Sequence, residues 1–232
     1  MNRGKTREFT EDIIVPYPEV ELAYNTDVIT RKFTALIHKI DQLRNKDTPT
    51  SVFRDIVEEI TLFEAIESSR KITLEEYELE TPICKAIGHK IVEKRIIIAP
   101  IMRGGLGMEP SVRRVFPQAK TGHIGIYRDK ITLEPVEYFW KMPQEIGEQD
   151  IFVLDPMLAT GKTADEVITK LEEIGCKKIH FLCIIAAPQG VELIQTKHPD
   201  VDLCIGALDF GLDYKGRIVP GLGDAGDRMF GT

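Results

Sequence analysis

The stretch "FVLDPMLATGKTA", residues 152–164, joins an apolar run to the first turn of an expected helix through a loop of small residues. Four apolar residues, 151–154, lead into Asp155, so the length of the run places this carboxylate at the carboxyl end of a buried strand. Lys162 then opens the helix. Ligands of open α/β sheets bind beyond the carboxyl ends of the strands. The stretch therefore predicts an α/β fold and the position of a ligand site.

The ending "GKT" invites comparison with a Walker A loop, which requires Gly-x-x-x-x-Gly-Lys-Thr. Counting back five positions from Gly161 gives Pro156 instead of the first glycine. Proline supplies neither the conformational freedom nor the backbone N–H of that glycine. The spacing therefore excludes the phosphate wrap of a nucleotide triphosphatase and disfavours a pyrimidine-nucleotide kinase.

The residues "ATGKT", 159–163, can instead hold one phosphate group. Their backbone N–H groups and the hydroxyls of Thr160 and Thr163 meet at a helix N-terminus, where the macrodipole favours an anion. Asp155 is suited either to accept hydrogen bonds from vicinal hydroxyls or to hold a hydrated Mg²⁺. Together these groups describe a sugar phosphate. The alternative is an ordinary strand-to-helix turn in which Thr160 only caps the helix.

Outward from this stretch, short β-branched runs alternate with helical patterns. The stretch 161–175 carries an apolar stripe, with Gly175 as a C-cap. The alternation predicts a Rossmann-like α/β fold with a mainly parallel sheet flanked by helices. Helical spacing over residues 25–44 and 48–66 predicts two preceding helices, the second with Thr50 or Ser51 as its N-cap. The apolar runs are "RIIIAP", "HIGIY", "DIFVLDP", "KIHFLCIIAAP" and "VDLCIGAL", and the stripe is Val167, Ile168, Leu171 and Ile174.

The segment from about 127 to 144 differs in composition from the rest of the chain, because it is polar and carries two prolines and clustered aromatic residues. The segment is predicted to form a projecting β-arm or hairpin. This arm could serve as a lid, but we favour a role in subunit contact. We expect the whole chain, 1–232, to form a single domain. Its N-terminal helical part spans about 1–94, and its ligand-binding core spans about 95–232.

The composition of the chain limits the classes of function that it can have. The chain has 232 residues, of which 43% are hydrophobic and 29% charged, as in ordinary globular domains. A formal net charge of −7 argues against broad binding to nucleic acid or to an anionic membrane. The polar N-terminus lacks the apolar core of a secretory signal, the apolar runs are too short to span a membrane, and the four cysteines lack CxxC spacing. We therefore expect a cytoplasmic protein with reduced cysteines.

Two further glycine-rich segments are candidate ligand loops. In "APIMRGGLGMEP", residues 99–110, a glycine pair allows close backbone approach and Arg103 offers a planar fork of donors to a phosphate. The alternative is a glycine-rich turn with a surface arginine. The chain ends in "IVPGLGDAGDRMFGT", residues 218–232, which is either an ordered loop presenting its backbone to a ligand or a flexible tail.

These three motifs together resemble the uracil phosphoribosyltransferase branch of the type I phosphoribosyltransferases. "DPMLATG" is the form that this branch shows in its loop for phosphoribosyl pyrophosphate (PRPP), and residues 99–110 are similar to its pyrophosphate loop. "PGLGDAGDRMFGT" is similar to its uracil-binding loop and is the most specific of the three. The resemblance is firm over about residues 95–232, and the N-terminal helices resemble the family only in general character. The chain departs from it at Gly104, where alanine is usual, and at Lys162, where glycine is common.

The resemblance implies a glycosyltransferase of pyrimidine salvage that transfers the 5-phosphoribosyl group of PRPP to N1 of uracil, giving UMP and diphosphate. It also implies Mg²⁺ as cofactor, held mainly by PRPP and water without a direct protein ligand. The implied catalytic residues are Arg103, Asp155 and Asp224. The implied PRPP-binding residues are Arg103, Arg128, Asp155, Pro156, Met157, Leu158, Ala159, Thr160, Gly161, Lys162, Thr163 and Asp224. The implied uracil-binding residues are Ile218, Gly223, Asp224 and Ala225.

The implied partners are small molecules, with GTP or CTP as a possible effector and no nucleic acid or membrane. We expect a homodimer or homotetramer, because the predicted arm can form a subunit contact and because the resemblance to the family implies such an assembly. The alternative function is that of a regulator that uses the PRPP fold to bind nucleotides or RNA without turnover. The acidic charge balance and the intact base loop count against this alternative.

Overall fold

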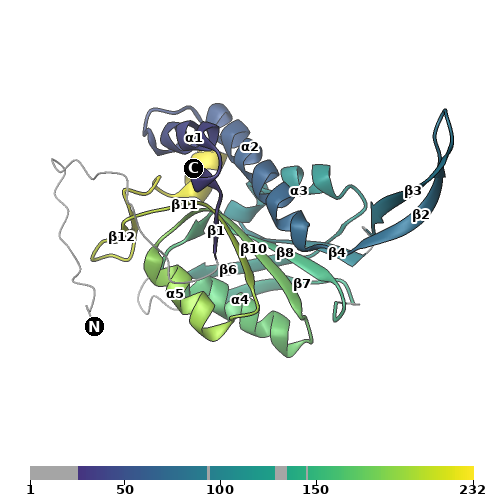
Figure 1. Ribbon diagram of the computed structural model, residues 1–232. Helices are drawn as coiled ribbons and strands as arrows, with labels where there is room; N and C mark the ends of the chain where they lie inside the picture. The colour runs from purple at the N-terminus through teal and green to yellow at the C-terminus, as the bar shows by residue number, and fades with distance from the viewer. Residues whose placement is uncertain (1–25, 93–94, 129–134, 145) are drawn as a thin grey trace.

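The five apolar runs predicted as strands all lie in one nine-stranded sheet at the centre of the protein (Figure 1). The computed structural model describes residues 26–92, 95–128, 135–144 and 146–232. The main path of the sheet has the order β1-β11-β10-β8-β4-β6-β7, with β5 paired to β4 and β9 paired to β10. The strands are β1 Asp27–Val28, β4 Ile96–Met102, β5 Lys120–Thr121, β6 His123–Arg128, β7 Pro135–Lys141, β8 Asp150–Leu154, β9 Met157–Leu158, β10 Lys178–Ala186 and β11 Asp202–Leu208.

Every pair in this sheet is parallel except β6–β7 at one edge. Because helices cover both faces, the central strands are buried on both sides and their sequences are continuously apolar. Alternate residues of β4 enter different cores: Ile96 and Ile98 belong to one, Ile97 and Ala99 to the other. The Rossmann-like α/β fold predicted from the sequence is confirmed.

The helices lie in two layers (Figure 1). α4 and α5 cover one face of the sheet, and α1, α2, α3 and α6 cover the other. The predicted stripe of α4 is buried at Val167, Ile168 and Leu171, but its fourth residue, Ile174, lies past the end of the helix and is exposed. Gly175 follows with φ +95°. The helices are α1 Thr34–Arg44, α2 Thr50–Ser68, α3 Glu109–Val115, α4 Lys162–Glu173, α5 Pro188–Lys197 and α6 Ala225–Phe230.

The N-terminal part departs from prediction at two helix starts. The first helix begins at Thr34, and Val28 instead lies in β1, paired with Ile205 of β11. Helical spacing alone could not reveal that β11 leaves an edge open for this short β-branched run. The second helix begins at Thr50 with Pro49 as N-cap, so neither Thr50 nor Ser51 is the cap. The carbonyl of Pro49 already accepts the first helical hydrogen bond, from the N–H of Phe53 at 2.8 Å.

A projecting β-arm is present, but residues 74–91 form it, within the part expected to be helical. β2, Leu74–Glu80, and β3, Lys85–Ile91, pair antiparallel and stand away from the body (Figure 1). The predicted hairpin forms between β6 and β7, but it continues the central sheet because β6 also pairs with β4. Residues 129–134 of the predicted arm lie outside the described residues.

The cysteines are free thiols, as predicted, with Cys176, Cys183 and Cys204 buried and Cys84 exposed on the arm. Across the described ranges, every helix is too short or too polar to cross a membrane.

Candidate active site

The loop after β8 forms a small cavity at the N-terminus of α4. Asp155 follows the strand directly, and Gly161, with φ +81°, is the N-cap of the helix. Because the cap residue is Gly161, the alternative in which Thr160 caps the helix is not the one realised. The first-turn N–H groups of a helix have no partner within it, so they are available to an anion. The cavity has a volume of about 100 Å³ and is lined by Asp155, Met157, Leu158, Ala159, Thr160, Gly161, Thr163 and Ala164.

A second cavity, of about 390 Å³, brings three distant segments together. Arg103 follows β4, Asp155 follows β8, and Asp224 lies in the C-terminal tail, yet all three line this space. The carboxyl ends of parallel strands meet at one edge of a sheet, which explains the convergence of the first two. The lining residues are Met102, Arg103, Gly104, Ile126, Tyr127, Tyr138, Asp155, Pro156, Met157, Asp224, Ala225 and Gly226.

A third cavity, of about 660 Å³, lies under the C-terminal loop. Met157 and Asp224 line both this cavity and the second one, while Asp155 lines the first two. The three cavities therefore adjoin and form one extended cleft. The residues of the third cavity are Met157, Ala159, Asp213, Tyr214, Gly216, Arg217, Ile218, Val219, Pro220, Gly223 and Asp224.

The pKa of the Asp155 carboxyl group lies near neutral pH. Burial raises its pKa to about 7, and the charge of Asp224 acts in the same direction. The N–H of Met157 donates to Oδ1 of Asp155 at 3.3 Å and opposes this rise. Desolvation and a like charge both disfavour the ionised form. An apo site of this kind favours ligands that supply hydrogen-bond donors or positive charge to the carboxylate.

Arg103 is held at the mouth of the cleft by the C-terminal tail. Its guanidinium donates to Oδ1 of Asp227 at 2.8 Å and to the hydroxyl of Thr232 at 3.2 Å. Asp224 caps α6 by accepting a hydrogen bond from the N–H of Asp227 at 2.9 Å. The tail therefore connects the two predicted charged residues, Arg103 and Asp224, through one short helix.

The structure brings most of the predicted site residues together. Arg103, Asp155 to Gly161, Thr163, Ile218 and Gly223 to Ala225 all line the cleft. Lys162 opens α4 and is exposed, outside the lining of these cavities. Arg128 ends β6, and its side chain lies outside the described part of the protein.

Sequence reasoning missed one wall of the third cavity. β12, Gly211–Leu212, pairs with β13, Ile218–Val219, and the turn between them is built around Asp213. Oδ1 of Asp213 accepts from the N–H of Lys215 at 2.9 Å and from that of Arg217 at 2.8 Å. An aspartate followed three residues later by glycine, as in "DYKG", is a typical turn signal that could have located this wall.

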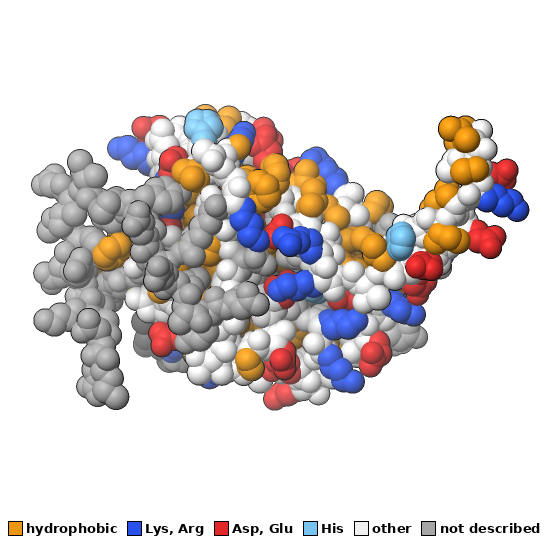
Figure 2. Space-filling model, viewed as in Figure 1, with side chains coloured by type: hydrophobic (Ala, Val, Ile, Leu, Met, Phe, Trp, Pro, Cys, Tyr) orange, Lys and Arg blue, Asp and Glu red, His pale blue; other side chains and the backbone are white. Residues whose placement is uncertain are grey.

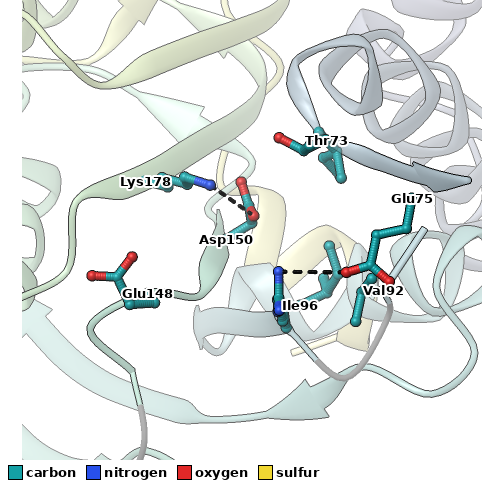
Figure 3. Close-up of a pocket in the computed structure, with 9 residues that line it drawn as sticks. Thr73, Glu75, Val92, Ile96, Glu148, Asp150 and Lys178 are labelled. Atoms are coloured by element: carbon teal, nitrogen blue, oxygen red, sulfur yellow. Dashed lines mark ion pairs between the residues drawn. The ribbon is translucent and has the colours of Figure 1, made fainter.

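A separate cavity of about 360 Å³ lies at the opposite edge of the sheet (Figure 3). Two ion pairs line it. Nζ of Lys178 lies 3.9 Å from Oδ2 of Asp150, as the dashed line in Figure 3 marks. Nη1 of Arg95 lies 3.8 Å from Oε1 of Glu75. Asp150 and Lys178 are the first residues of β8 and β10, so this cavity lies at the amino ends of the strands. Ligands of such sheets bind at the other end, so this cavity is not the candidate active site.

Within the described residues, no group of three or more His, Cys, Asp or Glu side chains could hold a metal ion directly. Two carboxylates, Asp155 and Asp224, nevertheless face the same cavity. A pair of carboxylates without further protein ligands suits a hydrated Mg²⁺ that a bound phosphate also coordinates.

Comparisons with known proteins agree with this geometry. The family model of uracil phosphoribosyltransferase matches residues 30–232. A Clostridium botulinum protein named uracil phosphoribosyltransferase is 48% identical over 205 residues, covering 88% of this chain and 98% of the relative. A Clostridium perfringens protein of the same name is 49% identical over 197 residues, covering 85% of this chain and 94% of the relative.

Among solved structures, the AQ2163 protein from Aquifex aeolicus superposes with a TM-score of 0.80 at 34% identity, covering 91% of this chain and 97% of that one. The match of the family model extends over the whole cleft, from Arg103 to the C-terminal tail, and over both helices α1 and α2. The chain belongs to the uracil phosphoribosyltransferase family.

Proposed function

We propose that the protein transfers the 5-phosphoribosyl group of PRPP to N1 of uracil, releasing UMP and diphosphate, as an enzyme of pyrimidine salvage. The observation that carries this proposal is the sharing of Asp155, Met157 and Asp224 between adjoining cavities. A phosphate cradle and a glycine-rich base loop therefore open onto one space. The family membership and the names of the relatives support the same reaction.

The first cavity suits the 5-phosphate. The N-terminus of α4 and the hydroxyls of Thr160 and Thr163 can bind an anion of this size. Asp155, one loop away, accepts hydrogen bonds from the ribose hydroxyls. Arg103 offers its fork of donors to the diphosphate once it leaves Asp227. In this proposal, separate protein groups bind the phosphate, the sugar and the leaving group.

Displacement at the anomeric carbon passes through an oxocarbenium-like state and needs no protein nucleophile. The enzyme must instead hold two substrates in line, and such positioning contributes on the order of 7–11 kcal/mol in favourable cases. Arg103 and Arg128 stabilise the departing charge of the diphosphate. Asp155 and Asp224 would hold a hydrated Mg²⁺ together with PRPP, and the ion would supply positive charge toward the departing diphosphate.

The third cavity suits the base. Ile218, Gly223 and Asp224 line it, and their backbone groups can pair with the edge of uracil. Uracil offers N3–H as a donor and two carbonyl oxygens as acceptors, whereas cytosine presents the opposite pattern at position 4 and lacks the N3 hydrogen. A site with fixed backbone polarity rejects the wrong pattern because buried polar groups would remain unpaired.

We also infer that the protein acts as a homodimer or homotetramer, and that GTP or CTP is a candidate effector. The arm β2–β3 supports the assembly, since it exposes hydrophobic side chains away from the body of the protein (Figure 2).

The reaction is tested by incubating the protein with uracil, PRPP and Mg²⁺ and measuring UMP and diphosphate by chromatography. ATP with uridine serves as the control for kinase activity, and cytosine with PRPP as the control for base choice. UMP formed only in the first mixture supports the proposal. Absence of UMP together with tight RNA binding would instead favour the regulatory alternative.

A further inference from the structure

A buried ion pair joins helix α1 to the base loop, which we define as residues 218–224. Arg44 is the last residue of α1, and Asp209 follows the last residue of β11. Nη1 of Arg44 donates to Oδ2 of Asp209 at 2.8 Å, and Nη2 donates to Oδ1 of the same carboxylate. The side chain of Asp209 is fully buried, and that of Arg44 is 13% exposed. This is a bidentate pair, the geometry in which arginine binds carboxylates most strongly.

Both partners also bind the backbone of Gly221, in the middle of the base loop. The N–H of Gly221 donates to Oδ2 of Asp209 at 2.8 Å, and its carbonyl accepts from Nη1 of Arg44 at 2.9 Å. Gly221 has φ +69°, and a Cβ there would lie 2.3 Å from the carbonyl oxygen of Ile218. The ion pair therefore holds the backbone in a conformation that only glycine adopts readily.

The position of Gly221 makes this anchor relevant to the ligand. Ile218 and Gly223 flank it on either side along the chain, and both line the third cavity, whereas Arg44 and Asp209 do not. On the other side, the N–H of Asp209 donates to the carbonyl of Ala186 at the end of β10, at 2.8 Å. Through these hydrogen bonds the base loop is connected to both the central sheet and α1. Its N–H and C=O groups can meet a base in fixed directions only while this anchor is in place.

We propose that Arg44 and Asp209 are positioning residues that set the geometry of the base loop and thereby the affinity for uracil. This inference rests on the proposed function, because it takes uracil as the ligand of the third cavity. It gives helix α1 a role in base recognition, although no atom of α1 lines the cavity. The phosphate cradle at the N-terminus of α4 lies on other elements, and the base loop contributes only Asp224 to the PRPP site, so the pair affects the affinity for PRPP much less than the affinity for uracil.

The test compares two carboxylates at opposite ends of β11. Asp209→Asn weakens the anchor, while Asp202→Asn disrupts a comparable pair, in which Oδ2 of Asp202 lies 3.0 Å from Nδ1 of His180, far from the cleft. We expect Asp209→Asn to raise KM for uracil about tenfold, the usual weight of a charge-assisted hydrogen bond, with KM for PRPP within about twofold. Asp202→Asn lowers the melting temperature but leaves both KM values unchanged.

Arg44→Lys is the second variant, because it keeps the charge and loses the fork. If the two residues act as one unit, the double variant Arg44→Lys/Asp209→Asn shows the same KM for uracil as the more affected single variant. Hydrogen exchange of the amides of residues 219 and 221–224 adds a readout independent of turnover, and we expect faster exchange in both single variants.

An unchanged KM for uracil in Asp209→Asn and Arg44→Lys would overturn the inference, whatever happens to the melting temperature. A parallel rise in both KM values would overturn it too, because it would indicate a general loss of structure. Failure of the proposed function appears differently, as a wild type that forms no UMP. In that case the exchange rates decide the matter: loop amides as protected in the variants as in the wild type exclude a positioning role.

Discussion

Asp155 carries a carboxyl group that the folded protein holds in an unfavourable environment. Asp155 is half-buried and lies near Asp224, and both the burial and the like charge disfavour its ionised form. We expect Asp155→Asn to weaken binding of PRPP by roughly tenfold or more, since a charged acceptor for two sugar hydroxyls is lost. Binding of uracil alone changes little. Calorimetry with each ligand separately measures both, and equal weakening would contradict the assignment of Asp155 to the sugar.

The same residue makes the stability of the apo protein depend on pH. The pKa of Asp155 rises from 3.8 to about 7 on folding, chiefly because of burial. Between these values the unfolded chain releases the proton and the folded protein keeps it, so this group costs stability progressively as pH rises, and fully above about pH 7. Asp155→Asn lacks this cost and should be more stable than wild type at pH 8 by on the order of 1–3 kcal/mol.

Urea unfolding at pH 4 and pH 8 measures this difference. The advantage of the variant should nearly disappear at pH 4, where the folded protein keeps the proton on Asp155 and the unfolded chain has lost only about half of it. A variant that is less stable than wild type at pH 8 would show that Asp155 is structurally required.

Arg103 is half exposed, and its side chain donates hydrogen bonds to Asp227 and Thr232 of the tail, so its removal should spare the fold. We expect Arg103→Ala to lower the rate of transfer by about 10²-fold or more, corresponding to the 3–4 kcal/mol typical of a lost transition-state donor. Arg114→Ala is the matched control, because Arg114 is also exposed and pairs with Glu58 at 3.1 Å on another surface. Near-normal turnover in Arg103→Ala would remove this residue from the mechanism.

At the scale of the element, helix α4 has a glycine in the left-handed region at each end. Gly161, with φ +81°, precedes the helix, and Gly175, with φ +95°, follows it. Alanine at either position costs about 1–2 kcal/mol of stability, because an L-residue adopts this conformation poorly. Only Gly161 lines the phosphate cavity, where an added Cβ would lie 3.0 Å from Leu193.

We therefore expect Gly161→Ala to lose more stability than Gly175→Ala in urea unfolding, because the new Cβ also crowds Leu193 and Gly190, and only Gly161→Ala to lose affinity for PRPP. Gly175→Ala isolates the cost of the left-handed conformation, since a Cβ at Gly175 meets no atom within 4 Å. Equal affinities for PRPP in the two variants would contradict the assignment of this helix terminus to the phosphate.

At the scale of the whole molecule, the β2–β3 arm stands away from the body, so the rest of the chain does little to stabilise it. Two strands without a further layer are marginally stable in water, and Ile83 and Ile87 on this arm are 93% and 59% exposed. Figure 2 shows hydrophobic and charged side chains side by side along it. A second copy of the chain would cover these side chains and stabilise the arm.

We expect sedimentation to give the mass of a dimer or tetramer, and the double variant Ile83→Ser/Ile87→Ser to shift the mass toward the monomer. Ile174→Ser, which removes an exposed side chain beside α4, is the control and should leave the mass unchanged. A wild type that sediments as a monomer at all concentrations would contradict the proposed assembly.

The sequence by itself determined the central strands, the place of Asp155 at the end of β8, the start of α4 at Lys162 and the three segments that line the cleft. Each of these depends on residues that are neighbours in the chain, where periodicity and spacing act directly. Only the tertiary structure decided that Val28 joins the sheet, that the projecting arm is residues 74–91, and that Arg44 meets Asp209, 165 positions away. These features depend on partners far away in sequence, and local patterns do not specify such partners.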